Sequence, residues 1–179
     1  MVISRVLTVD DLAEAALPEH WELVNGEIVA LSPSSGKSAR IGGRIYALFL
    51  RHGEEPGLGF AYPAEAGFLL FDDRQTLRSP DAAFVVRDRL PTEPEGFVPV
   101  APDLAVEVLS PSDRMADTLA KIAMYLAAGV VMVLLVDPSA QTILVFRPDE
   151  SVTMLSVDDW LDGGDILPGL RVPVSEIFR

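Results

Sequence analysis

The sequence predicts an α/β or α+β fold with one mixed central sheet. Residues 103–109 and 130–136 have the pattern of buried strands, and residues 112–128 between them have the apolar spacing of a helix. A strand, a helix and a second buried strand in succession predict a right-handed crossover that joins two parallel strands. Hairpins elsewhere in the chain add antiparallel strands, so we expect a mixed sheet flanked by helices.

The N-terminal part of the chain predicts a short helix followed by a hairpin. Thr8 and Asp11 have the spacing of a capping box, which predicts a helix over residues 9–16. Residues 21–30 are two strand-like segments on either side of an Asn-Gly step at residues 25–26. This dipeptide between apolar runs is the strongest short-range signal for a β-hairpin.

The middle of the chain predicts one long helix, two strands and a loop. Apolar side chains recur at helical spacing over residues 38–51. Residues 65–71 and 82–86 have the composition of strands. Residues 87–100 are rich in proline and charge, so we expect an exposed loop there.

The C-terminal half predicts a capped helix and a second hairpin. Ser110 has the character of an N-cap, with Pro111 in the first turn and Asp113 at the third helical position, where its charge suits the helix dipole. The apolar strand that follows turns into another strand at residues 142–147. A short capped helix is expected at Ser175.

The composition predicts a cytoplasmic protein of one domain over residues 1–179. There is no cysteine, which excludes disulfides and thiolate zinc sites and fits a reducing cytoplasm. The two histidines are too few for a typical zinc centre, so a metal would be a hard ion bound by oxygen. The acidic N-terminus argues against a signal peptide, and the apolar run 122–136 is shorter than the roughly 20 residues of a membrane span.

Glu107 is the most informative residue, because a carboxylate within an apolar strand is costly to bury without a cation, a donor or a pocket. Asp103 lies on the same face of that strand, but four residues of strand separate the two by about 13 Å. One Mg²⁺ cannot bridge that distance. Asp81 heads a different strand, and neighbouring strands lie only about 4.8 Å apart. Asp81 is therefore the better metal partner of Glu107.

Lys121 lies on the predicted helix that follows the strand of Glu107. The chain has only one other lysine, and every other basic side chain is arginine. A lysine in this background indicates a site that needs a compact ammonium able to lose or share a proton. The alternative is a solvated residue paired with Asp117 one turn earlier. Tyr125, one turn later on the same face, lies near the site or packs in the core.

Other charged residues leave two interpretations open. Glu22, in the predicted N-terminal hairpin, is either a third carboxylate of the site or an exposed strand residue. The net charge of −13 opposes binding to nucleic acid, because an acidic protein repels a polyanion. Lys37, Arg40, Arg44 and Arg51 nevertheless fall on one helical face, which is either an ordinary solvated face or a strip that contacts phosphates.

Several segments together resemble the Uma family, a large bacterial group of restriction-endonuclease-like proteins long catalogued as a domain of unknown function. The resemblance covers nearly the whole chain and is carried by residues 21–27, 79–84, 102–113 and 128–138, with Lys121 and Tyr125. It implies membership of the PD-(D/E)XK nuclease superfamily, which has a mixed sheet flanked by helices and a site that binds Mg²⁺.

The resemblance also implies roles for individual residues. Asp81 resembles the Asp of the motif, Glu107 its (D/E) and Glu22 the N-terminal Glu of the family. The lysine of the superfamily normally stands two residues after the (D/E), and that position is Leu109 here. The family supplies the amine from the following helix instead, which matches Lys121.

The leading hypothesis is a Mg²⁺-dependent endonuclease, with Mn²⁺ as a possible substitute, that hydrolyses DNA phosphodiester bonds. Asp81 and Glu107 would hold the metal, with Glu22 and the Val108 carbonyl as further ligands. Lys121 would orient or deprotonate the attacking water. A homodimer is expected, because two cuts on antiparallel strands suit two-fold symmetry.

A second hypothesis comes from a different class of protein. The chain could be a catalytically silent nuclease fold that acts as a binding module in a defence or mobile-element system. The net acidity favours it, and so does Ser38, where many members of the family carry His. The cluster of Asp81, Glu107 and Lys121 opposes it. A glycosidase acid/base pair ranks lowest, because two Trp and three Tyr offer few platforms for sugars.

Overall fold

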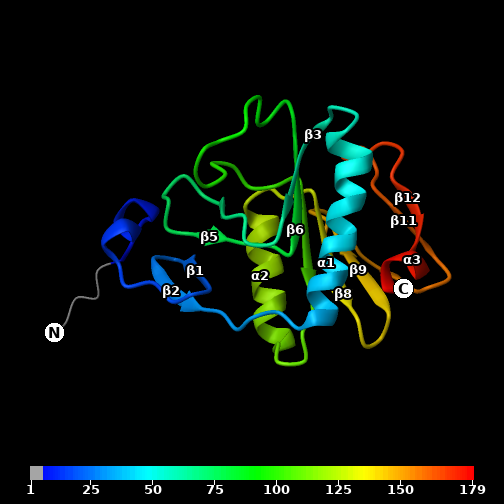
Figure 1. The fold of residues 1–179 in the computed structure, drawn as a ribbon, viewed down its shortest axis with the longest axis horizontal. Coiled ribbons are helices and arrows are strands. Elements are labelled where there is room, and N and C mark those ends of the chain that lie inside the picture. Colours follow the sequence, from blue (N-terminus) through cyan, green and yellow to red (C-terminus); the bar gives the residue numbers. More distant parts are fainter. Residues whose placement is uncertain (1–5) are drawn as a thin grey trace.

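The computed structural model of the chain describes residues 6–179 and has a six-stranded sheet at its centre (Figure 1). The start of the N-terminal stretch that was read for a signal peptide lies outside these residues. The strand order is β10-β9-β8-β7-β6-β3. The strands are β3 (Gly59–Pro63), β6 (Ala82–Val86), β7 (Leu104–Val108), β8 (Met132–Asp137), β9 (Thr142–Phe146) and β10 (Val152–Leu155). β7 and β8 are parallel and the other neighbours antiparallel, so the sheet is mixed as predicted.

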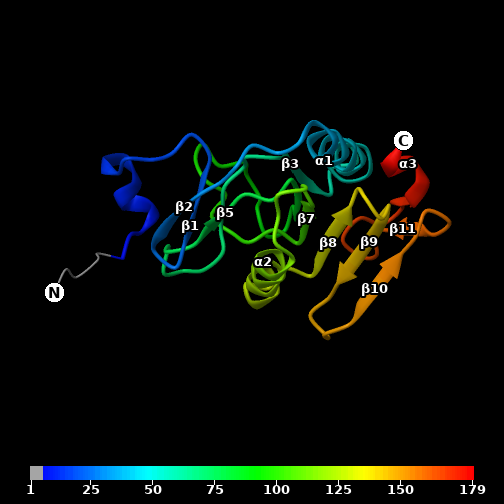
Figure 2. The same cartoon turned by 90° about the horizontal axis from the view of Figure 1, so that it is seen from below.

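The two long helices cover opposite faces of this sheet (Figure 2). α2 (Met115–Ala127) connects the parallel strands β7 and β8, which confirms the predicted crossover. Its Ile122 and Tyr125 are buried among the odd-numbered side chains of β6, β7 and β8. α1 (Gly36–Phe49) packs Ile45 against the even-numbered ones. Because side chains alternate along a strand, Asp81 and Glu107 are expected on the face covered by α2.

A second, four-stranded sheet carries the N-terminal hairpin. Its order is β2-β1-β5-β4, and the strands are β1 (Trp21–Val24), β2 (Glu27–Ala30), β4 (Phe68–Leu69) and β5 (Leu77–Arg78). Asn25 and Gly26 both have positive φ, as the tight turn of a two-residue hairpin requires, so this prediction is confirmed. Pairing of Leu23 with Leu77 places Glu22 beside β5.

Shorter elements complete the fold. They are the 3₁₀ helix η1 (Val9–Glu14), the π-helical turn η2 (Leu50–Glu54), the two-stranded sheet of β11 (Trp160–Asp162) and β12 (Arg171–Pro173), and α3 (Val174–Phe178). The capping box of Thr8 and Asp11 is present, and α3 contains the expected helix at Ser175. Within the described residues, no helix combines the length and apolar character needed to cross a membrane.

The predicted start of α2 is wrong. The helix begins at Met115, with Arg114 as its N-cap, rather than after Ser110. The backbone N–H of Ser110 donates to Asp113 Oδ2 at 2.6 Å, and the N–H of Asp113 donates to the Ser110 carbonyl at 3.0 Å. The Asp113 carboxylate therefore closes a separate turn before the helix, and Pro111 lies inside that turn.

Two other predicted segments differ from the structure. The strand expected over residues 65–71 is reduced to β4, and the φ of 73° at Glu65 excludes that residue from extended backbone. The loop over residues 87–100 is not fully exposed, since Leu90 and Val98 are buried in the core beneath α2. The Val98 backbone also bonds with Gly67 and Leu69, so this loop is fixed against β4.

Candidate active site

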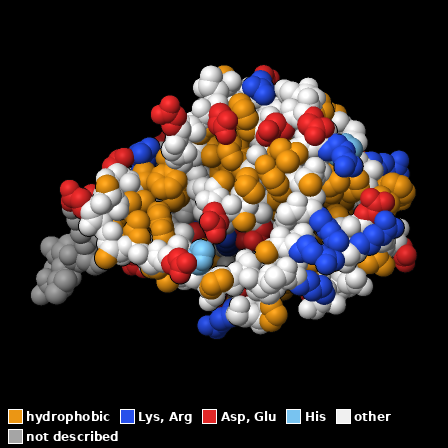
Figure 3. Space-filling view, in the orientation of Figure 1, with side chains coloured by type: hydrophobic (Ala, Val, Ile, Leu, Met, Phe, Trp, Pro, Cys, Tyr) orange, Lys and Arg blue, Asp and Glu red, His pale blue; other side chains and the backbone are white. Residues whose placement is uncertain are grey.

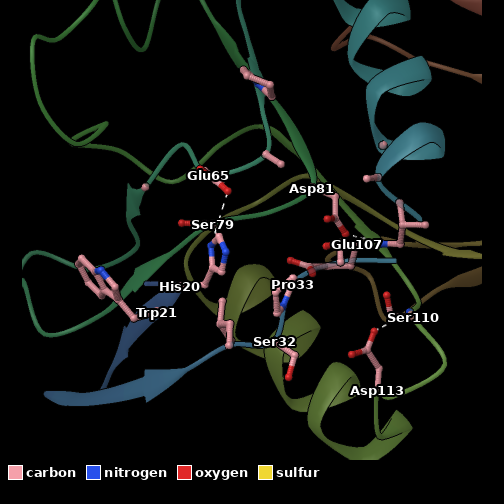
Figure 4. A pocket seen from close by; sticks show the side chains of 18 of the residues that line it. His20, Trp21, Ser32, Pro33, Glu65, Ser79, Asp81, Glu107, Ser110 and Asp113 are labelled. Atoms are coloured by element: carbon pink, nitrogen blue, oxygen red, sulfur yellow. Dashed lines mark hydrogen bonds and ion pairs between the residues drawn. The ribbon is translucent and has the colours of Figure 1, made fainter. Parts of the chain in front are cut away.

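Asp81 and Glu107 are cross-strand neighbours. The β6–β7 register pairs Ala82 with Val106, so the next pair in the same register is Asp81 with Glu107. The N–H of Asp81 donates to the Val106 carbonyl at 2.8 Å, and Asp81 Oδ2 accepts from the N–H of Val108 at 2.7 Å. Directly opposed side chains on one face of an antiparallel pair lie close together. Figure 4 shows the two carboxylates side by side in the pocket.

Asp103 does not belong to this cluster. Its Oδ2 accepts a hydrogen bond from the N–H of Val86 at 2.8 Å, and its Oδ1 forms an ion pair with Arg89 at 3.0 Å. Both carboxylate oxygens of Asp103 therefore stabilise the end of the β6–β7 pair that is opposite to Asp81 and Glu107. This agrees with the prediction that Asp81, and not Asp103, is the partner of Glu107.

Lys121 is buried between two carboxylates, and only 15% of its side chain is exposed. Its Nζ lies 2.8 Å from Glu107 Oε1 and 3.0 Å from Glu22 Oε1. The alternative of a solvated pair with Asp117 is wrong, because Asp117 faces Arg114 instead. The crossover places this face of α2 against β7, which is why a residue so far along the helix returns to the strand of Glu107.

The pKa of Lys121 is raised by its two carboxylate neighbours. Burial lowers the pKa of this amine, but the charges and hydrogen bonds of Glu107 and Glu22 outweigh burial and raise it above the ordinary value. Lys121 therefore holds its proton at neutral pH. Of the two expected roles, loss of the proton does not fit this environment, whereas an ammonium that shares its protons with acceptors does.

Glu22 is a buried ion-pair partner, and its side chain is 1% exposed. Its Oε2 accepts from Arg78 at 2.7 Å, and its Oε1 accepts from the N–H of Ser79 at 2.8 Å as well as from Lys121. Burial raises the pKa of Glu22, but the charges of Lys121 and Arg78 reverse this and lower it overall. The reading of Glu22 as an exposed strand residue is therefore wrong.

The three carboxylates near Lys121, which are Asp81, Glu107 and Glu22, fall into two electrostatic types. Burial raises the pKa of Glu107 to about 7, and the charge of Lys121 opposes this shift while those of Asp81 and Glu22 add to it. Burial also raises the pKa of Asp81, against the hydrogen bond from Val108. Glu22, which has two cationic partners, is shifted the other way. The positive charge around Asp81 and Glu107 is therefore too small to offset the effect of burial on their pKa values. The positive charge around Glu22 is large enough to do so.

The donor set suits a small divalent ion held by two carboxylates. Within residues 6–179, the bonds to Glu107 fall on Oε1 and the bond to Asp81 falls on Oδ2. One oxygen of each carboxylate is left over, and both residues line the pocket. No group of three or more His, Asp or Glu side chains in the described chain is placed to hold a metal. Two carboxylates completed by water and substrate are a usual arrangement for Mg²⁺.

The cluster opens into a cleft of about 930 Å³ between the N-terminal hairpin and α1. Figure 3 shows the hollow on this face, with acidic (red) and basic (blue) side chains at its base. The cleft is also lined by His20 and Glu65, whose Nδ1 and Oε1 atoms lie 3.6 Å apart (Figure 4). On the opposite side, Gly42 of α1 lies so close that a Cβ there would be 3.3 Å from the Asp81 carbonyl oxygen.

The basic residues of α1 do not line this cleft. Lys37 donates to the Pro138 carbonyl at 2.7 Å, Arg40 to that of Arg179 at 2.6 Å and Arg44 to that of Ile177 at 3.1 Å. The cleft side of α1 is formed by Ala39, Gly42, Gly43 and Tyr46 instead. Figure 3 shows Lys and Arg side chains gathered beside the hollow, between α1 and α3. Their role in contacting phosphates stays a prediction.

Ser38 has a structural role at the start of α1. It is buried, and its hydroxyl donates to the Leu109 carbonyl at 2.9 Å. The hydroxyls of Ser35 and Ser110 lie 2.8 Å and 3.2 Å from it. The serine therefore joins the N-terminus of α1 to the segment after β7.

Arg78 and Gly42 are site residues that sequence reasoning missed. Arg78 neutralises Glu22, and Gly42 allows α1 to approach Asp81. In the structure Arg78 lies on the short strand β5, three positions before Asp81, and no strand was predicted there from the sequence. Gly42 is followed by Gly43 within a helix, where two glycines are unfavourable without a packing reason.

The mixed sheet and its carboxylate–lysine cluster can be compared with those of known proteins. A crystal structure from Anabaena variabilis ATCC 29413, described as a "putative nuclease belonging to DUF820", has the same fold, with a TM-score of 0.82 and 22% sequence identity. The alignment covers 96% of this chain and 97% of that chain. The model of the Uma2 family, described as "Putative restriction endonuclease", matches residues 10–175. The chain belongs to this family, which confirms the resemblance in its motifs. No curated protein matches the chain.

Proposed function

We propose that the protein is a Mg²⁺-dependent endonuclease that hydrolyses phosphodiester bonds in DNA. The observation that carries the proposal is the placement of Asp81 and Glu107 on neighbouring strands at an open cleft, with the Lys121 ammonium 2.8 Å from Glu107. Membership of a family of restriction-endonuclease-like proteins supports this reaction over other uses of paired carboxylates.

Asp81 and Glu107 would hold the ion through the carboxylate oxygens that accept no bond from the described chain. Mg²⁺ or Mn²⁺ would supply a Lewis acid that stabilises negative charge developing on the phosphate and lowers the pKa of a bound water. The raised pKa values of both carboxyl groups support this assignment, because a divalent cation relieves the cost of ionising them in a buried position.

Lys121 would orient the attacking water or a phosphate oxygen, and it would do so as a cation. The raised pKa of its amine favours this role over removal of a proton from water, which needs the neutral form. Glu22 would act through Lys121 and not as a metal ligand, since its two oxygens already accept from Arg78, Ser79 and Lys121. The proposed metal ligands are thus reduced from three carboxylates to two.

Duplex DNA would reach the cleft with its phosphates against the basic side chains between α1 and α3. Lys37, Arg40 and Arg44 each use one donor on a backbone carbonyl, which leaves further donors for phosphate oxygens. A homodimer in the cytoplasm remains part of the proposal, because cleavage of both antiparallel strands suits two copies related by a two-fold axis.

The direct test is cleavage of plasmid DNA by the purified protein with Mg²⁺ or Mn²⁺. We expect Lys121→Ala and Glu107→Gln each to lower the rate by about 10²-fold or more, the size of effect seen when one group that stabilises developing charge is removed. Glu95→Gln, an exposed carboxylate outside the cleft, is the matched control and should cleave like the wild type. Undiminished cleavage by both site variants would refute the mechanism.

Metal binding distinguishes this proposal from a silent binding module. Calorimetric titration of the wild type with Mn²⁺ should show one site that Glu107→Gln abolishes. A catalytically silent fold would give no site-specific heat, and its cleavage assays would show no dependence on either residue.

A further inference from the structure

Tyr125 is a fully buried side chain that contacts the proposed metal ligand. It lies on α2 one turn after Lys121, and its exposed fraction is 0%. Its hydroxyl donates to Glu107 Oε1 at 2.8 Å. The Lys121 ammonium is 2.8 Å from the same oxygen, so one face of α2 supplies two donors to a single carboxylate oxygen.

The two donors differ in how firmly they can hold Glu107. A lysine ends in a flexible four-carbon chain whose ammonium can follow a moving partner. The ring of Tyr125 is packed in the core beneath α2, with only two side-chain torsions, so the position of its hydroxyl is determined by the core. The phenol is the donor in this contact, and the carboxylate oxygen accepts.

We propose that Tyr125 is a positioning residue that turns the Glu107 carboxylate so that Oε2 is presented to the metal. The inference rests on the function proposed above. With Oε1 held by Tyr125 and Lys121, the remaining lone pairs of Glu107 lie on the oxygen that no described residue occupies. Partners of this kind typically change metal affinity by about 10- to 100-fold.

A purely structural role for Tyr125 makes a different prediction. In that case the phenol would only satisfy its own buried hydroxyl, and its removal would leave metal affinity unchanged. The chain provides a matched comparison in Tyr62, whose hydroxyl is buried without a hydrogen-bond partner within the described residues. Tyr62→Phe removes the same atom from a partly buried tyrosine that forms no hydrogen bond with a proposed ligand in the described structure.

The experiment compares Mn²⁺ binding by calorimetry in the wild type, Tyr125→Phe and Tyr62→Phe, with urea unfolding of each protein. We expect Tyr125→Phe to bind Mn²⁺ about 10- to 100-fold more weakly. Tyr62→Phe should bind like the wild type. Cleavage by Tyr125→Phe should return toward the wild-type rate at saturating Mn²⁺, because the variant retains both ligands and Lys121.

Each outcome bears on a separate proposal. Equal Mn²⁺ affinity of Tyr125→Phe and the wild type would overturn the role of Tyr125 and leave the nuclease proposal standing. Absence of Mn²⁺ binding in the wild type would overturn both. If Tyr125→Phe does not fold, the hydroxyl proton of Tyr125 can be followed by NMR in the wild type. Its resonance should move when Mg²⁺ is added, and an unchanged resonance at saturation would overturn the inference.

Discussion

The two lysines of the chain lie on the two long helices of the fold, but their side chains make different contacts. Each is on a long helix that covers one face of the six-stranded sheet. Lys37, in the first turn of α1, is exposed and donates to the Pro138 carbonyl. Lys121, in the middle of α2, is buried between Glu107 and Glu22. Residue type and helical spacing do not separate them, and the difference lies in what each amine meets.

The same contrast extends to the arginines. On α1, Arg40 and Arg44 hold the C-terminal segment by donating to its backbone carbonyls, and Arg40 is exposed. Beside α2, Arg78 is paired with buried Glu22. Charge on the α1 side can be screened by salt, whereas charge in the cluster is shielded from it. Stability should therefore depend on the cluster, and salt-dependent binding on the α1 side.

Replacing each lysine by alanine should give the largest difference in the free energy of unfolding. Lys121→Ala leaves Glu107 and Glu22 without a shared cation and should lower the free energy of unfolding by about 3 kcal/mol or more, the cost of breaking a buried pair. Lys37→Ala should cost about 1 kcal/mol or less. Urea unfolding at neutral pH without metal measures both. Equal losses would show that the buried cluster contributes no more than the surface.

In the metal-free protein, the pH dependence of stability measures the contribution of Glu107 to the free energy of unfolding. Its pKa is raised on folding from 4.5 to about 7, so its contribution is fully present below pH 4.5 and is lost as the pH rises through about 7. The wild type should lose roughly 3 kcal/mol relative to Glu107→Gln between these limits, at about 1.4 kcal/mol for each pKa unit. Urea unfolding of both proteins across this pH range is the measurement.

A divalent cation should reverse this loss, since it favours the ionised carboxylate. Adding Mg²⁺ at pH 8 is therefore expected to stabilise the wild type and not Glu107→Gln. A wild-type curve parallel to that of Glu107→Gln at every pH would contradict the assignment.

Glu22→Gln tests whether this carboxylate serves as the ion-pair partner of Lys121 and Arg78 and not as a metal ligand. The variant keeps the shape of the side chain and an acceptor for Ser79, but it loses the charge that faces Arg78 and Lys121. We expect a loss of about 2 kcal/mol in the free energy of unfolding, in the range for hydrogen bonds to charged groups, with Mn²⁺ affinity retained. Calorimetry and urea unfolding provide the two readings.

Glu54→Gln is the control for this prediction, because Glu54 accepts from the N–H of Ala61 without an ion pair in the described structure. It should cost less than about 1 kcal/mol. Loss of Mn²⁺ binding in Glu22→Gln would restore Glu22 as a metal ligand.

The smallest effect is expected on the α1 side. In a Glu107→Gln background that prevents cleavage, Arg40→Gln should weaken DNA binding about equally for all sequences and reduce the slope of log affinity against log salt by about 1. Fluorescence anisotropy over a salt series measures it. Arg147→Gln, whose arginine lies in the β9–β10 turn away from α1, is the comparison, and equal slopes in the two variants would exclude Arg40 from the DNA surface.

Much of the fold was predictable because it depends on local patterns. The crossover through α2 and the Asn25-Gly26 hairpin follow from apolar periodicity and turn chemistry, and both are confirmed. The start of α2 was not predictable in this way. Ser110 and Pro111 favour a helix start, but the Asp113 carboxylate closes a competing turn with the same residues.

The site was predictable only as far as strand pairing follows from sequence. Asp81 was expected beside Glu107, and the β6–β7 register brings the two strands together at that point. No strand pairing could be predicted for Arg78, and the Gly42-Gly43 step indicates close packing without indicating which segment packs there. Their roles come from the packing of β5 and α1 against segments distant in the chain.

The sequence by itself determined which chemical groups were available: hard oxygen ligands, no thiols and a lysine on the helix after Glu107. Alternating and helical patterns also determined the crossover and the two long helices, because these patterns decide which faces are buried, but they did not predict β3, β5, β10, β11 or β12. Only the tertiary structure decided that Glu22 closes an ion pair with Lys121 and Arg78, and that Lys121 keeps its proton. Both depend on local charge and burial, which arise when distant segments exclude water around the same few atoms.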